Sequence, residues 1–162
     1  MTLALTIEEL LAYSDHERQK WRQWLRANPG RLAIPFQQGG RFPTIGAVLD
    51  HLFLVERRHL SRLQGGPVPD RTDIDGSDVE ALFEYADAVR ADYRAYVTAL
   101  PDAAGTIVLN LNLGTFAVPR KKLAVQILLH EVRHLAQIAY AARVAGDEPP
   151  EYLDYLFSPE PV

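Results

Sequence analysis

The feature that most constrains the fold is a set of four long segments with helical periodicity, each bounded by proline or glycine. In the second segment, Val48, Leu52, Val55, His59 and Leu63 follow one another at steps of three or four residues, which places them on one face of an α-helix. The four segments cover residues 6–28, 44–65, 77–101 and about 119–144. Four amphipathic helices of this length predict an all-α fold, with a four-helix bundle as the leading arrangement.

The ends of these segments carry recognisable helix signals. Thr6 with Glu9, and Ser77 with Glu80, have the spacing of a capping box, in which each side chain binds a free backbone N–H of the first turn. Gly146 is placed to end the fourth helix. The stretch between the first two helices is long enough for a crossover, so a simple up-down-up-down order is not implied.

Residues 104–118 have a different pattern. Ile107, Leu109, Leu111 and Leu113 alternate with other residues, and this period of two predicts a β-strand. Gly114-Thr115 then predicts a turn into a second strand, so we expect a short β-hairpin before the fourth helix. Residues 151–157 are expected to form one more short helix.

Length and composition restrict the classes of function. A chain of 162 residues fits one domain, which we expect to span residues 1–162. The net charge of −4 argues against a nucleic-acid-binding protein. There is no cysteine, which excludes disulfides, cysteine-ligated metals and a cysteine nucleophile. With no signal-peptide pattern and no apolar run of the roughly 18 residues needed to span a bilayer, we expect no membrane contact and a cytoplasmic location.

The fourth helical segment contains the sequence His130-Glu131-Val132-Arg133-His134. Two histidines four residues apart lie only about 40° apart around a helix, so both imidazoles point the same way and can bind one metal ion. They also lie on or beside the apolar face, where neutral imidazoles without partners would be unsatisfied. The alternative is that both are surface histidines, or core histidines bonded to their neighbours.

This HExxH pattern is also that of zinc peptidases, in which the glutamate activates water. A third ligand would then be expected downstream, but no histidine follows His134. Only Glu148 and Glu151 remain as carboxylates there, and they flank a Pro-Pro pair. The extended pattern requires Gly at 137 and His at 140, where this chain has Gln137 and Tyr140.

A third ligand from upstream gives a different interpretation. His51 on the second segment, His130 and His134 on the fourth, and Gln137 three residues later together resemble the pattern of the DinB/YfiT-like metal-binding four-helix bundles. The resemblance covers nearly the whole chain, including the hairpin. It departs from the family where Leu135-Ala136 replaces an Arg-Gly type of pair.

The resemblance implies a divalent metal ion, zinc or nickel, held by His51, His130 and His134. It also implies a metal-dependent enzyme, either a thiol S-transferase that uses bacillithiol or mycothiol, or a hydrolase. The alternative is a non-enzymatic metal- or ligand-binding stress protein, and the HExxH peptidase is a further one. Because the chain has no cysteine, a thiol would have to come from a small-molecule cofactor.

Two further residues are candidates beside the metal ligands. Glu131 would serve as a catalytic base or would orient a ligand, with a structural or solvated carboxylate as the alternative. Gln137 would donate a hydrogen bond to a ligand from outside the metal shell, with an ordinary interhelical contact as the alternative. The expected partners are a small-molecule substrate and a second copy of the chain, in a homodimer of the kind that family relatives form.

Overall fold

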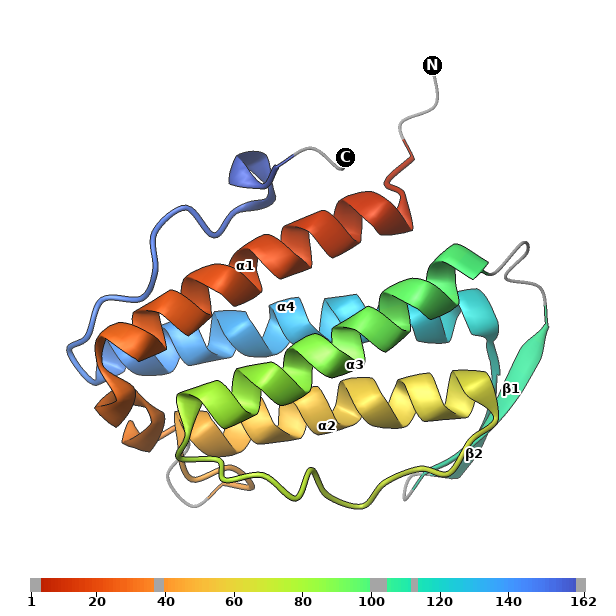
Figure 1. Ribbon diagram of the computed structural model, residues 1–162, viewed down its shortest axis with the longest axis horizontal. Coiled ribbons are helices and arrows are strands. Elements are labelled where there is room, and N and C mark those ends of the chain that lie inside the picture. Colours follow the sequence, from red (N-terminus) through yellow and green to blue (C-terminus); the bar gives the residue numbers. More distant parts are fainter. Residues whose placement is uncertain (1–3, 37–39, 100–104, 112–113, 160–162) are drawn as a thin grey trace.

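The computed structural model describes residues 4–36, 40–99, 105–111 and 114–159. It confirms the all-α fold, with four long helices and one β-hairpin before the last helix (Figure 1). The long helices are α1 (Ile7–Ala27), α2 (Ile45–Gln64), α3 (Val79–Ala99) and α4 (Arg120–Val144). The hairpin strands are β1 (Thr106–Leu111) and β2 (Gly114–Pro119), and two 3₁₀ helices are η1 (Pro29–Ala33) and η2 (Tyr155–Phe157).

The helices do not follow simple up-down-up-down order. Around the bundle, α1 lies beside α4, α4 beside α2, α2 beside α3, and α3 beside α1. Helices α1 and α4 run in one direction and α2 and α3 in the other, as Figure 1 shows. The connection through η1 therefore crosses from α1 to the diagonal helix α2. The segment 65–78 then runs back along the bundle, so that α3 starts at the same end as α2.

The capping box predicted for the first helix is present, and the second helix is capped as well. The Thr6 hydroxyl accepts from the Glu9 N–H, and the Glu9 carboxylate accepts from the Thr6 N–H, which completes the capping box. Thr44 caps α2 in a similar way, accepting from the Ala47 N–H. Gly65 ends α2 with a φ of 72°, a left-handed conformation that glycine adopts at little cost.

The capping box predicted at Ser77 is wrong. Helix α3 is capped by Asp78, whose carboxylate accepts from the N–H groups of Glu80 and Ala81. The Ser77 N–H and hydroxyl both bind the Asp75 carboxylate instead, one turn before the helix. Two good capping residues stand side by side here, and the competing Asp75 decides which of them begins the helix.

The hairpin and the tail cover opposite parts of the bundle. The two strands pair in antiparallel register, and Leu109 of β1 is buried against the helices. Of the residues predicted for the hairpin, 104 and 112–113 lie outside the described part of the chain. The tail runs over α1, where the Tyr155 and Tyr13 rings meet edge to face at 5.5 Å (Figure 1). The short helix predicted over 151–157 is confined to the 3₁₀ turn η2.

The buried apolar side chains form two clusters along the bundle. One includes Trp21, Phe53, Ala86 and Leu135. The other, nearer the hairpin, includes Leu11, Leu60, Tyr93 and Leu128. Each helix buries mainly one face. Within the described residues, no helix is long and apolar enough to cross a membrane.

A ring of buried charges separates the two clusters. Arg18 of α1 contacts Glu56 at 2.7 Å and Glu131 at 2.8 Å. Arg90 of α3 contacts the same two carboxylates, Glu56 at 2.8 Å and Glu131 through a short contact. The Ser14 hydroxyl donates to Glu131 at 2.7 Å. Each helix supplies one charge, and two of the contacts join helices that lie diagonally across the bundle.

The ring is electrically balanced, which is the condition for burying charges. The four side chains are between 2% and 6% exposed. Burial by itself would raise the pKa of Glu131, but the charges of Arg18 and Arg90 lower it below its usual value. Removing one member of such a group leaves an uncompensated charge in the core, which typically costs about 3–5 kcal/mol.

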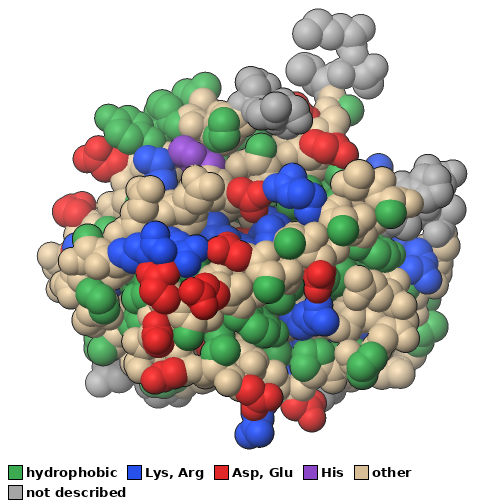
Figure 2. Space-filling view, viewed as in Figure 1, with side chains coloured by type: hydrophobic (Ala, Val, Ile, Leu, Met, Phe, Trp, Pro, Cys, Tyr) green, Lys and Arg blue, Asp and Glu red, His purple; other side chains and the backbone are tan. Residues whose placement is uncertain are grey.

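Ion pairs also join α1 and α3 at the surface. Charged side chains gather along the face that these two helices form (Figure 2), where Arg22 pairs with Asp87 and Arg94 with Asp15. Asp87 and Arg94 are both more than half exposed. Surface pairs of this kind stabilise a fold only slightly because water already solvates both charges. The ring, rather than this outer layer, is therefore the costly element to disturb.

We predict that Glu56→Gln will lower the free energy of unfolding by about 3–5 kcal/mol, because Arg18 and Arg90 each lose a buried charged partner. Urea unfolding followed by circular dichroism measures the change. The control is Glu80→Gln, which removes a carboxylate from the surface pairs with Arg22 and Arg26. Equal losses in the two variants would contradict a dominant role for the ring.

Candidate metal centre

The orientation of α4 follows from the buried ring. Glu131 points into the core. His130 and His134 lie about 100° and 60° around the helix from Glu131, both in the same direction of rotation. The side of α4 that carries them faces the seam between α4 and α2, the most extensive helix contact in the bundle. The Nε2 atoms of His130 and His134 approach to 3.1 Å, and the ring centroids are 4.4 Å apart.

Helix α2 brings His51 to the same place. Its ring centroid lies 5.6 Å from that of His130 and 5.5 Å from that of His134. One ring nitrogen from each histidine can be chosen so that all three lie within 4.8 Å of one another. The three residues that the sequence singled out as ligands therefore meet in space, from helices about 80 positions apart in the chain.

The environment keeps the imidazoles uncharged. Burial lowers the pKa of His51 to about 4, and His134, Arg41 and Arg58 act in the same direction. Burial also lowers the pKa of His130 to about 3, with His134 as the next contribution. The pKa of His134 is likewise lowered, again by burial first. Neutral imidazoles have the lone pairs that a metal ion requires.

The polar atoms of His134 are only partly satisfied by the protein. Its Nδ1 is buried and has no hydrogen-bond partner of good geometry among the described residues. Gln137 is close enough to raise the pKa of His134, in opposition to burial, and its side chain is otherwise exposed. Gln137 is therefore placed beside the ligand group, as its spacing predicts, without closing a bond to Nδ1.

One aromatic neighbour was missed by the sequence analysis. The Phe42 ring lies 4.5 Å from the His51 ring at a tilt of 34°, and 6.4 Å from the His134 ring, edge to face. Phe42 precedes α2 by three residues, so it folds back over the seam. The Arg41 guanidinium lies 5.2 Å from the Phe42 centroid. The available signal was an aromatic residue just before a helix whose second turn carries a histidine.

Glu131 and His59 lie apart from this group. Glu131, which the HExxH pattern offers as a base, is 2% exposed and holds Ser14, Arg18 and Arg90 inside the bundle. His59 is not part of the three-histidine group, and its Nδ1 lies 3.3 Å from a nitrogen of Arg62. Among the described residues, the potential ligands brought together at the seam are all histidines.

The arrangement of the three histidines could hold one metal ion. Three half-buried ring nitrogens lie close enough together to hold one metal ion, and three ligands leave at least one position of a four-coordinate ion free. Imidazole ligands suit zinc, nickel and copper, whereas magnesium and calcium prefer oxygen. Three protein ligands with a free position is the pattern of catalytic rather than closed structural zinc sites.

The chain was compared with known proteins. The model of one protein family, the DinB family, matches residues 1–161. A search of curated proteins finds no match.

We predict that the metal-free protein will show His51 and His130 titrating near pH 4 or below, rather than near 6.5 as in the urea-unfolded chain. Between those values the unfolded chain binds protons that the native protein does not. The free energy of unfolding should therefore fall as the pH falls through this window. Proton NMR of the imidazole C–H groups measures both states, and ordinary titration in the folded protein would contradict the buried, neutral site.

Proposed function

The chain belongs to the DinB family, and from this premise we propose that it binds a divalent metal ion through His51, His130 and His134. The observation that carries the proposal is the convergence of three ring nitrogens within 4.8 Å of one another. Zinc and nickel are the ions we propose, because both accept three nitrogen ligands and keep positions free.

The residues present fit such an ion. Two neutral imidazole nitrogens that face each other at 3.1 Å can share one hydrogen bond, which leaves the His134 Nδ1 without a partner and does not include His51. The low pKa values of His51 and His130 also favour a cation that binds lone pairs over protons. A shared metal ion satisfies all three rings at once.

We further propose that the protein is a metal-dependent enzyme, of the thiol S-transferase or hydrolase type. A bound divalent cation lowers the pKa of a thiol or water beside it. The chain has no cysteine, so a thiol would come from a low-molecular-weight cofactor. Gln137, with Phe36, Ala136 and Tyr140, lines a surface pocket of about 380 Å³ that would have room for an organic substrate, and Gln137 is close enough to His134 to raise its pKa.

Two alternatives differ in measurable ways. A non-enzymatic metal-binding protein would bind the ion but would not transform electrophiles in the presence of any small thiol. A HExxH peptidase would need Glu131 free to activate water, whereas this carboxylate contacts Arg18 and Arg90 in the core. That placement supports the three-histidine interpretation over the peptidase, and we propose a structural role for Glu131.

We also propose that the protein forms a homodimer and is located in the cytoplasm. The exposed apolar side chains of α4, Leu129, Tyr140 and Val144, are available for a homodimer contact. The corresponding face of α1 is partly covered by the tail, so α4 is the better candidate of the two helices. A cytoplasmic location fits the cysteine-free composition.

We predict about one zinc or nickel ion per chain after purification without an affinity tag. His51→Ala, His130→Ala and His134→Ala should each weaken metal binding by more than the roughly 10–100-fold that loss of an outer-sphere partner costs. Elemental analysis and competition with a chromogenic chelator measure content and affinity. The control is His16→Ala, a histidine of α1 that binds the Tyr152 carbonyl. Full metal retention in His51→Ala would contradict the cross-helix site.

We also predict that chelation will lower the melting temperature without unfolding the helices. A ligand at 100 times its Kd stabilises a fold by about 2.7 kcal/mol, and this contribution disappears when the ion is removed. Both apolar clusters and the charged ring remain, because none of them includes a histidine. Circular dichroism before and after EDTA is the measurement. Loss of helicity at room temperature would mean that the fold depends on the metal.

A further inference from the structure

The arginines fall into two populations. Eight of them form ion pairs with carboxylates: Arg18, Arg22, Arg26, Arg31, Arg57, Arg71, Arg90 and Arg94. Six others form no ion pair with the acidic residues of the described ranges: Arg41, Arg58, Arg62, Arg120, Arg133 and Arg143. Three of these six, Arg41, Arg58 and Arg133, are neighbours of the three histidines in space or along their helices, although the chain as a whole carries a net charge of −4.

Two of these arginines lie next to residues of the histidine site. Arg41 stacks on Phe42, which in turn lies against His51, so the guanidinium is one ring away from the site. Arg133 immediately precedes His134 on α4. Both side chains are exposed, and no hydrogen bond ties either guanidinium to another described residue. Their donors are therefore available to a ligand.

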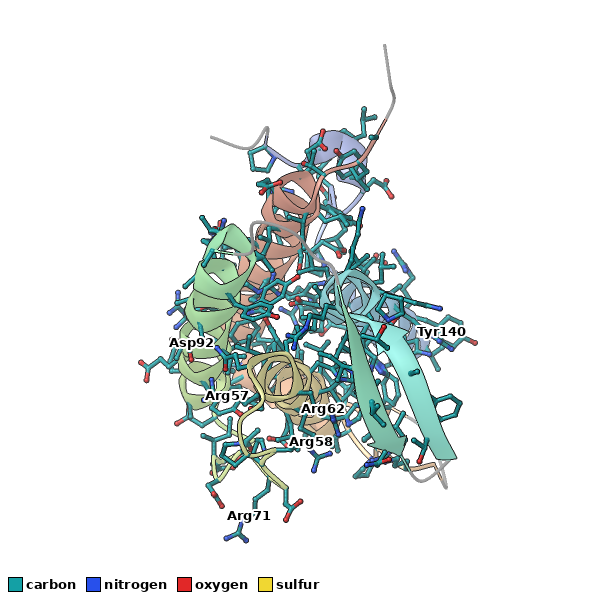
Figure 3. All side chains as sticks on the ribbon, turned by 90° about the vertical axis from the view of Figure 1, so that its right-hand side faces the viewer. Arg57, Arg58, Arg62, Arg71, Asp92 and Tyr140 are labelled. Atoms are coloured by element: carbon teal, nitrogen blue, oxygen red, sulfur yellow. The ribbon has the colours of Figure 1, made fainter. Side chains whose placement is uncertain are left out.

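Two more extend along the same side of α2. Arg58 follows His51 by seven residues, which returns it to within about 20° of the same helix face. It donates to the carbonyls of Pro69 and Asp70, which hold the side chain but do not neutralise it. Arg62 lies one turn further on. Figure 3 shows Arg58 and Arg62 on the side of α2 away from α3, while Arg57 extends toward Asp92 of α3.

The carboxylates that the sequence places near the histidines are directed elsewhere. Glu131 and Glu56 belong to the buried ring and are balanced there. Asp50, next to His51, accepts from the Thr72 hydroxyl and lines a separate cavity with Leu32 and Ile74.

We propose that the three-histidine site takes an anionic small-molecule substrate, one that carries a carboxylate or a similar oxyanion beside the atom that approaches the histidines. This inference rests on the proposed function and specifies its substrate class. Arg41 and Arg133 are the residues that bind the anionic group, because their guanidinium N–H groups are free and match a carboxylate with two parallel hydrogen bonds. Arg58 contributes charge from a fixed position.

The chemistry favours a small anion over a nucleic acid. Nucleic-acid binding uses a basic face that extends along the molecule. Here three of the unpaired arginines lie near one site, and the face formed by α1 and α3 carries paired charges of both signs. An uncompensated cation cluster beside a divalent site selects a ligand with more than one negative charge.

The test uses the cobalt-loaded protein, titrated with mercaptosuccinate and with 2-mercaptoethanol while the visible absorption of Co²⁺ is followed. The first thiol carries two carboxylates and the second carries none. We expect the affinity for mercaptosuccinate to be at least about fivefold higher than the affinity for 2-mercaptoethanol, which corresponds to two modest charge contacts. In the double variant Arg41→Gln/Arg133→Gln this advantage should disappear, while the affinity for 2-mercaptoethanol should change by less than about twofold.

The matched control is Arg57→Gln, which removes one positive charge from the surface pair with Asp92 and should keep the preference. The preference should also decrease with added salt in the wild type, as expected for exposed charges. Equal binding of the two thiols, or a preference that survives in the double variant, would overturn the anionic substrate while leaving the metal site intact. Failure of the wild type to bind cobalt would overturn the proposed function itself.

Discussion

The buried ring of Arg18, Glu56, Arg90 and Glu131 is the constraint on which the rest of the structure depends. Each helix supplies one member, so a rotation or slide of any helix would separate opposite charges in a medium where separation is costly. Apolar contacts specify such alignment less strictly because the hydrophobic effect is not directional. The two apolar clusters supply most of the stabilisation, and the ring between them fixes how the four helices are aligned.

Most of the fold could be predicted from the sequence, but the ring could not. Periodicity and turn residues located the helices and the hairpin because these signals are local. A charged residue in a helix is normally solvent-exposed, so the sequence alone favours a surface position for Arg18. A signal was present, since Arg18 stands midway between Leu11 and Leu25, at seven residues from each. A charge at that position of an apolar stripe, matched by opposite charges on other helices, indicates a buried network.

The candidate site, like the fold, could be predicted from the sequence only in part. The pair His130 and His134 could be predicted from the helix period alone. Its joining with His51 depended on resemblance to a family, because no local rule says which residue of α2 faces a given residue of α4. Phe42 was missed for the same reason, since it reaches the site through a loop. Contacts within one helix follow from spacing, and contacts between helices depend on the rotation that the ring imposes.

The same rotation decides what the HExxH pattern means in this chain. A helix carries the glutamate about 100° away from the first histidine, so both cannot face the same seam when the glutamate is required in the core. Here Glu131 contacts two buried arginines, and the histidines are turned to the edge between α4 and α2. The Glu131 carboxylate, which is next to His130 in the sequence, is therefore engaged by the two arginines of the core. Arg41 and Arg133 form no ion pair with the acidic residues of the described ranges, and in the proposed site an anionic ligand supplies the negative charge.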